Sequence, residues 1–171
     1  MTNDPKISID LEKIAKAVDA AALDGLNAIQ IALSATVRKV LSQPGTGRIY
    51  RISSGKAKGR NLRARGFHRA SAPGNPPAVD TNRLRSSWSI SAGNVTPGNS
   101  ETAKEGYVTA SRRPDRVVLA YGSAVVYARR LEFGGGRIAA RPYLAPAVRV
   151  VGPKALRIMS VAMKRTLGGA A

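Results

Sequence analysis

Apolar residues recur at steps of three and four through residues 8–42, which predicts a long amphipathic helix at the start of the chain. The stripe consists of Leu11, Ile14, Val18, Ala22, Leu26, Ile29, Leu33, Val37 and Val40. Gln30 falls on another face, and Pro44 ends the pattern. A helix of this length would be about 50 Å long, which is more than a domain of this size covers. We therefore expect it either to bend near Gly25 or to pack part of its stripe on a neighbouring subunit.

Residues 141–167 carry a second helical stripe. It consists of Leu144, Val148, Val151, Ala155, Met159 and Ala162. Pro142 suits the first turn of a helix, where its missing amide costs nothing, so we expect the helix to open at Arg141. Pro153 lies inside the stripe and must kink or split the helix.

A short helix is predicted at residues 81–88. Asp80 or Thr81 can cap its start by accepting a hydrogen bond from a free backbone amide. The helical spacing then places Leu84 and Trp88 on one face. We expect both side chains to belong to the core.

Strands are predicted at residues 87–92, 107–111 and 116–121, with a turn at 113–115 between the last two. The stretch at 117–121 is almost entirely apolar, which favours a central strand. Residues 125–133 fit either a short helix or a strand.

A basic arm is predicted at residues 43–80. No acidic residue occurs in this segment before Asp80. It contains eight basic residues: Arg48, Arg51, Lys56, Lys58, Arg60, Arg63, Arg65 and Arg69. Glycines such as Gly45 and Gly47 loosen this backbone, so we expect most of the arm to be mobile in an isolated chain and to become ordered on a partner. Three prolines predict a stiff, extended strap at 72–79.

The charge of the whole chain indicates an acidic partner. The 28 Lys and Arg residues exceed the 10 Asp and Glu residues, for a formal charge of +18. Such an excess destabilises a compact fold through self-repulsion, so DNA phosphates or an acidic protein surface are expected to offset it. The absence of cysteine excludes a disulfide framework. The start of the chain lacks a secretion signal, and no apolar run approaches the about twenty residues of a membrane span, so we expect a soluble chain made in the cytoplasm.

The residues needed for catalysis are sparse. His68 is the lone histidine, the carboxylates are scattered, and the glycine run at 134–136 lacks the Lys-Ser/Thr of a phosphate-binding loop. We therefore expect no catalytic residue, no cofactor, no metal site and no enzymatic activity. Six aromatic residues are expected to anchor the core rather than stack on bases: Trp88, Tyr107, Tyr121, Tyr127, Phe133 and Tyr143.

Glu132 is the acidic residue with the most informative surroundings. It lies among Arg129, Arg130 and Arg137, and a carboxylate can hold a guanidinium through two parallel hydrogen bonds. Two interpretations are open: an ion pair within the chain that fixes residues 127–134, or a salt link to the arm or to the next subunit.

Three strings in order, PGNPPAVDTNRLRSS from residue 73, YARRLEFGGG from 127 and ARPYLAPAV from 140, resemble the motif series of the neck or tail-completion proteins of lambda-like long-tailed phages. The match covers residues 66–150. Asn82 stands where the family usually has glycine, and Gly135 stands where threonine is common. The resemblance implies a virion protein without enzymatic activity that forms a ring, expected to be a hexamer, between the connector and the tail. Subunit-interface candidates are Arg83, Arg85, Arg130, Glu132 and Arg137.

The sequence as a whole predicts one α+β domain over residues 1–171. In it, a small antiparallel sheet and short helix at 81–140 pack with the two terminal helices, and the basic arm extends from them. We expect the chain in the virion neck, assembled in the bacterial host cytoplasm, with possible backbone contact to packaged DNA and no membrane contact. A tail terminator ring and a non-specific double-stranded DNA-binding protein are the alternatives.

Overall fold

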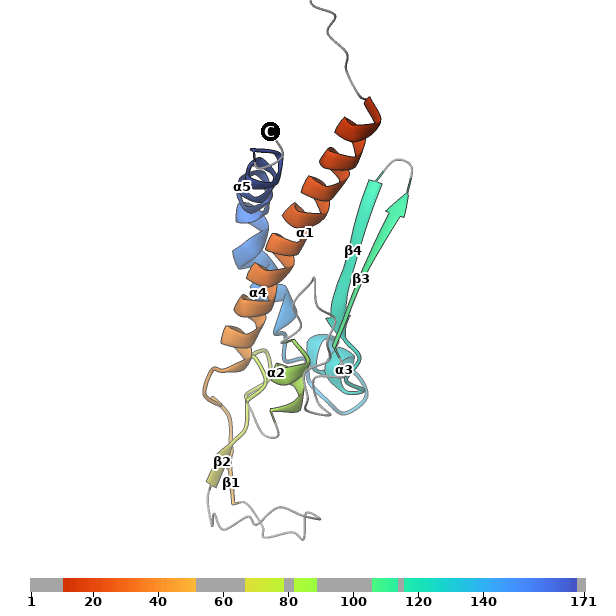
Figure 1. Ribbon diagram of the computed structural model, residues 1–171. Coiled ribbons are helices and arrows are strands. Elements are labelled where there is room, and N and C mark those ends of the chain that lie inside the picture. Colours follow the sequence, from red (N-terminus) through yellow and green to blue (C-terminus); the bar gives the residue numbers. More distant parts are fainter. Residues whose placement is uncertain (1–10, 52–66, 79–81, 89–105, 114–115, 169–171) are drawn as a thin grey trace, which may run out of the picture.

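The computed structural model describes residues 11–51, 67–78, 82–88, 106–113 and 116–168. Helix α1 (Leu11–Leu41) forms the long axis of an α+β fold. Helix α5 (Ala155–Gly168) packs along one side of α1 and runs antiparallel to it, while the hairpin of β3 (Gly106–Arg113) and β4 (Arg116–Ser123) lies along the other side (Figure 1). The predicted α+β class, with a helix at each end of the chain and a small antiparallel sheet, is confirmed.

Helix α1 runs through Gly25 without interruption. A Cβ atom on Gly25 would lie 2.7 Å from Cγ of Met159, which means that this glycine lets α5 approach closely. The first half of the apolar stripe is poorly covered, because Ile14 and Val18 are 50% and 46% exposed. Packing of this part of the stripe on a neighbouring subunit stays a prediction.

The buried face of α1 differs from the apolar stripe. Gln30, expected on another face, is buried together with Ser34 and Val37. The Ser34 hydroxyl donates to the backbone carbonyl of Trp88, and the Tyr121 hydroxyl donates to the same oxygen over 3.0 Å. The buried polar groups on this face thus have hydrogen-bond partners, Ser34 with Trp88 at the end of the short helix and Gln30 with Tyr121.

Pro153 splits the C-terminal helical region, as predicted. Helix α4 (Leu144–Val151) ends at a short 3₁₀ turn, η2 (Gly152–Lys154), and α5 follows directly. The start differs from the prediction, since α4 begins at Leu144 and leaves Pro142 outside the helix.

The described strands form two separate two-stranded sheets. Strands β3 and β4 pair along their full length, and β1 (Ile49–Arg51) pairs with β2 (Phe67–Arg69) at the base of the arm. The hairpin is confirmed. Within the described residues β4 pairs with β3 alone, and the central position expected for 116–121 stays a prediction. Of the strand expected at 87–92, Ser87 belongs to helix α2 (Arg83–Ser87), and the part from residue 89 lies outside the described residues.

The core gathers at one end of the molecule. Its buried residues are Val37, Leu41, Leu84, Trp88, Val125, Ala128, Tyr143 and Ala147. Trp88 makes edge-to-face contacts with Tyr121 and Tyr143, with ring centroids 5.0 and 6.0 Å away. The core role expected for Tyr107 and Phe133 is wrong, because these side chains are 47% and 76% exposed.

Helix α1 also passes the test of length and composition for a membrane span, over Glu12–Leu41 with a mean hydropathy of 1.3. The expectation that no stretch is apolar enough was therefore too strong. A core helix of a soluble protein passes the same test, and α1 packs against α5, α4 and β4, so composition alone does not assign it to a membrane.

Candidate functional site

The base of the arm is a closely crossed pair of chain segments. The Gly47 amide donates to the Ala70 carbonyl over 2.7 Å, and the Ala70 amide donates to the Arg48 carbonyl over 3.0 Å. A Cβ atom on Gly45 would lie 1.9 Å from the Arg69 carbonyl oxygen. The glycine expected to loosen the backbone is thus the point where the two segments touch. The β1–β2 hairpin extends from this crossing, away from the body (Figure 1).

The structure describes three of the eight predicted arm cations. Arg48 and Arg69 are exposed, and Arg51 ends β1 opposite Phe67. The Arg48 guanidinium lies 5.6 Å from the centre of the Tyr50 ring. The other five, Lys56, Lys58, Arg60, Arg63 and Arg65, lie outside the described residues.

The predicted extended strap begins with a turn instead. The Asn75 amide donates to the Ala72 carbonyl over 3.2 Å, and Gly74 has a φ of 81°. Proline at the second position and a positive-φ glycine at the third are the requirements of a type II turn. The Gly74 amide also donates to the Ala140 carbonyl over 2.8 Å, so the turn ties the arm to the chain before α4.

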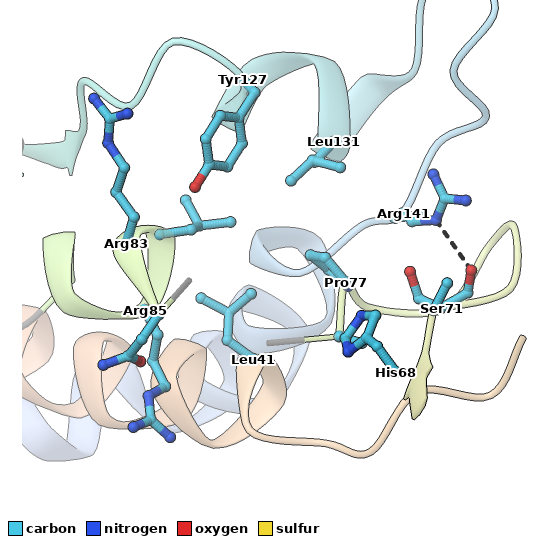
Figure 2. Close-up of a pocket in the computed structure, with 13 residues that line it drawn as sticks. Leu41, His68, Ser71, Pro77, Arg83, Arg85, Tyr127, Leu131 and Arg141 are labelled. Carbon is cyan, nitrogen blue, oxygen red and sulfur yellow. Dashed lines mark hydrogen bonds between the residues drawn. The ribbon is translucent and has the colours of Figure 1, made fainter. Parts of the chain in front are cut away.

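A hollow of about 330 Å³ opens where the arm base, α2 and helix α3 (Ala128–Phe133) meet. In Figure 2, Tyr127 and Leu131 point down from the α3 segment toward Leu41 and Pro77. The apolar interior is therefore built by segments far apart in the sequence.

Basic groups lie around this hollow. Arg83 and Arg85 line one side, and His68 and Arg141 line the other (Figure 2). Arg85 donates to the Ser42 hydroxyl over 3.1 Å, and Arg141 Nε donates to the Ser71 carbonyl over 3.3 Å. These bonds fix two of the arginines inside one chain, while the interface role predicted for Arg83 and Arg85 stays a prediction.

Helix α2 begins with an unusual backbone. Its N-cap residue, Asn82, has a φ of 61° and makes no side-chain capping bond. Asparagine is one of the few residues other than glycine that adopt this left-handed conformation readily. The predicted capping residues, Asp80 and Thr81, lie outside the described residues.

Glu132 caps helix α4 from a distance. Its Oε2 accepts hydrogen bonds from the amides of Tyr143 and Leu144 over 2.8 and 2.9 Å, and its Oε1 accepts from the Ala145 amide over 2.9 Å. A buried carboxylate at these positions satisfies three free amides of the first turn and complements the positive end of the helix dipole. The bonds lie within the chain, but they run to backbone amides rather than to the arginine expected from the sequence.

The same environment affects Tyr143. Burial, with a smaller contribution from the negative charge of Glu132, raises the pKa of the Tyr143 hydroxyl to about 12. Burial also raises the pKa of Tyr121. Both tyrosine hydroxyls are therefore protonated and uncharged at physiological pH.

A second hollow, of about 700 Å³, lies beside the glycine run. Arg129, Arg130 and Arg137 line it together with the exposed ring of Phe133. Gly135 and Ile138 close the turn through paired backbone hydrogen bonds of 3.0 and 3.1 Å. Arg130 and Arg137 thus share a basic surface, whereas Glu132 faces α4; their predicted interface roles are untested.

In the described part of the chain, no three His, Cys, Asp or Glu residues are grouped closely enough to hold a metal ion. Comparisons with known protein families, with curated proteins and with solved structures find no match.

Proposed function

We propose that this chain is a structural protein of the head-to-tail neck of a long-tailed phage particle, where its copies form a closed ring around the DNA channel. The carrying observation is the incomplete cover on both sides of α1: among described residues, β3 and β4 pair only with each other, and α5 has no buried side chain. A two-stranded ribbon is marginal alone, and strand edges are usually covered. Neighbouring copies would supply that cover.

Hydrogen bonds between the three resembling strings support the assignment. The Gly74 amide donates to the Ala140 carbonyl, joining the first string to the third. The Arg141 amide donates to the Leu131 carbonyl over 2.6 Å, and Glu132 caps α4, which joins the second to the third. Asn82 adopts the left-handed backbone at the position where the family usually has glycine. The strings therefore form one physical unit, which gives a reason for their joint occurrence.

In the proposed ring, each copy makes the same contact with the next copy around the ring. The ring is expected to be a hexamer. Strand addition along a β3 or β4 edge is the proposed docking mode. Candidate polar contacts between neighbouring copies are Arg83, Arg85, Arg130 and Arg137. The arm is proposed to reach the adjacent connector or tail ring and to order there, with some of its cations facing the DNA.

Particle assembly without this chain tests the neck role. Full heads and finished tails should then accumulate unjoined, and adding the purified chain should join them. Tails of irregular length would instead identify a terminator. Joined, infectious particles would overturn both assignments.

DNA binding by the purified chain tests the other alternative, which its charge of +18 favours. Binding to a duplex is measured over a range of salt concentrations. Weak binding at physiological salt is expected for the neck protein, since a channel that grips DNA slows its passage. Submicromolar binding with a steep salt dependence would favour a DNA-binding protein.

A further inference from the structure

A groove runs along the exposed side of the α1–α5 pair, apart from the arm and both hollows described above. Its floor is apolar and consists of Ala28, Ile31, Ile158, Val161 and Ala162. Ile31 and Val161 are 54% and 63% exposed, although both are large aliphatic side chains. The groove encloses about 1060 Å³.

The packing of α5 leaves this groove incomplete. No residue of this 14-residue helix is buried, even though α5 packs mainly against α1. Two helices in contact leave a furrow on each side, and a third helix fills such a furrow in a bundle. At about 1.5 Å per residue, α5 offers a furrow of about 20 Å, the length of a helix of about four turns.

The polar rim of the groove is mainly positive. Lys154, Arg157 and Arg165 line it, against a single carboxylate, Asp24. Asp24 also accepts a hydrogen bond from the Thr166 hydroxyl over 2.7 Å. The rim thus favours acidic side chains beside an apolar strip.

We propose that this groove binds an amphipathic helix of a partner protein, with its apolar face on Ile31 and Val161 and its acidic side chains on Lys154 and Arg157. Helix-in-groove recognition buries the apolar face, and the flanking charges set orientation and specificity. The inference does not depend on the proposed place of the chain in a phage neck.

Other occupants fit the groove less well. Within the described residues, a second copy offers few carboxylates: outside the groove they are Glu12, which pairs with Lys16 over 2.7 Å, Asp19, and the buried Glu132. DNA phosphates gain nothing from an aliphatic floor. An anionic lipid surface shares the charge preference of the rim, so binding to lipid vesicles is one of the outcomes that the test below distinguishes. The combination of apolar floor and basic rim therefore favours an acidic helix.

The test selects binders from a display library of amphipathic helices about 16 residues long, against the full chain. Apolar stripe positions vary among Leu, Ile, Val, Met and Ala, and flanking positions vary among Glu, Lys, Gln and Ser. The selection uses the wild-type chain alone, and the selected clones are then measured on Val161→Asp, which places a charge on the floor. We expect enriched clones to carry Glu at the flanks.

The affinities of the selected peptides for matched variants sharpen the test. Val161→Asp and Arg157→Glu should each weaken binding about tenfold or more, equivalent to about 1.4 kcal/mol. Leu156→Asp is the control: Leu156 is on the same helix and 83% exposed, but it does not line the groove, so this variant should leave the affinity within about twofold. Circular dichroism checks that each variant keeps its helical content.

Four results would overturn the proposal. Selected clones without acidic flanks would show that the basic rim does not select acidic side chains. Clones that bind Val161→Asp as well as the wild-type chain would show that they do not bind in the groove. Self-association of the wild-type chain that Val161→Asp abolishes would make a second copy the occupant. Binding to anionic lipid vesicles that the same variant abolishes would make it a lipid surface.

Discussion

The two ends of this molecule are built to different degrees of completeness. At the Trp88 end, the buried cluster around Trp88 joins α1, α2, α3 and α4. At the distal end, comprising the first half of α1, α5 and the β3–β4 ribbon, large apolar side chains such as Ile14 and Val161 remain half-exposed or more. The contrast teaches that the chain stabilises itself at one end and presents apolar surface at the other. Substitutions at the two ends should therefore differ in what they disrupt.

Trp88→Ala should have the largest effect. The ring is 2% exposed and contacts two tyrosines, so its removal should lower the free energy of unfolding by about 3–5 kcal/mol. Phe133→Ala is the matched aromatic control, and because Phe133 is 76% exposed it should change stability by less than about 0.5 kcal/mol. Urea denaturation of the isolated chain measures both. Equal losses would mean that the buried Trp88 ring contributes no more to stability than the exposed Phe133 ring.

Glu132→Gln should come next. An amide side chain loses the charge and turns a donor toward backbone donors, so a loss of about 2 kcal/mol is expected. Glu12→Gln is the control, because Glu12 belongs to an exposed pair with Lys16 and should cost less than about 0.5 kcal/mol. Should the two variants prove equally stable, the cap on α4 contributes nothing measurable.

The sequence contained the local elements of this fold but few of the contacts between them. Helical periodicity predicted both terminal helical regions, and Pro153 predicted the point at which the C-terminal one is split. The burial of Gln30 could not be predicted from periodicity, because the side chain hydrogen-bonds to Tyr121 of β4, which is remote in the chain. The close approach of α5 at Gly25 could not be predicted, because the partner residue, Met159, is remote in the chain.

The role of Glu132 left one signal in the sequence that was missed. Residues 141–143, Arg-Pro-Tyr, precede α4 without Ser, Thr, Asp or Asn to cap it. A helix that lacks its own cap needs an acceptor from elsewhere, and Glu132 is the carboxylate nearest in sequence before it. The groove between α1 and α5 left no such signal, because it depends on which faces of two remote helices meet.

Alkaline pH should weaken the Trp88 end through Tyr143. The folded-state pKa of about 12 exceeds the ordinary value of 10.0, so stability is full below pH 10 and falls as the pH rises toward 12, because only the unfolded chain ionises there. Wild type should lose more stability over this window than Tyr143→Phe, as measured by denaturation at several pH values. Parallel curves for the two proteins would show that Tyr143 ionises equally well in the folded chain.

Ile14→Ser and Val18→Ser should have the smallest effects on the isolated chain. Both side chains are about half exposed, so each substitution should change the free energy of unfolding by less than about 0.5 kcal/mol. In the proposed ring, a neighbouring copy can cover these side chains. The same substitutions would then weaken assembly of the ring. Denaturation at a concentration where the chain is monomeric, followed by sedimentation of assembled particles, separates the two effects. A loss above about 2 kcal/mol in the monomer would contradict the comparison, because a loss of that size is typical of core positions and would mean that the distal end is already closed.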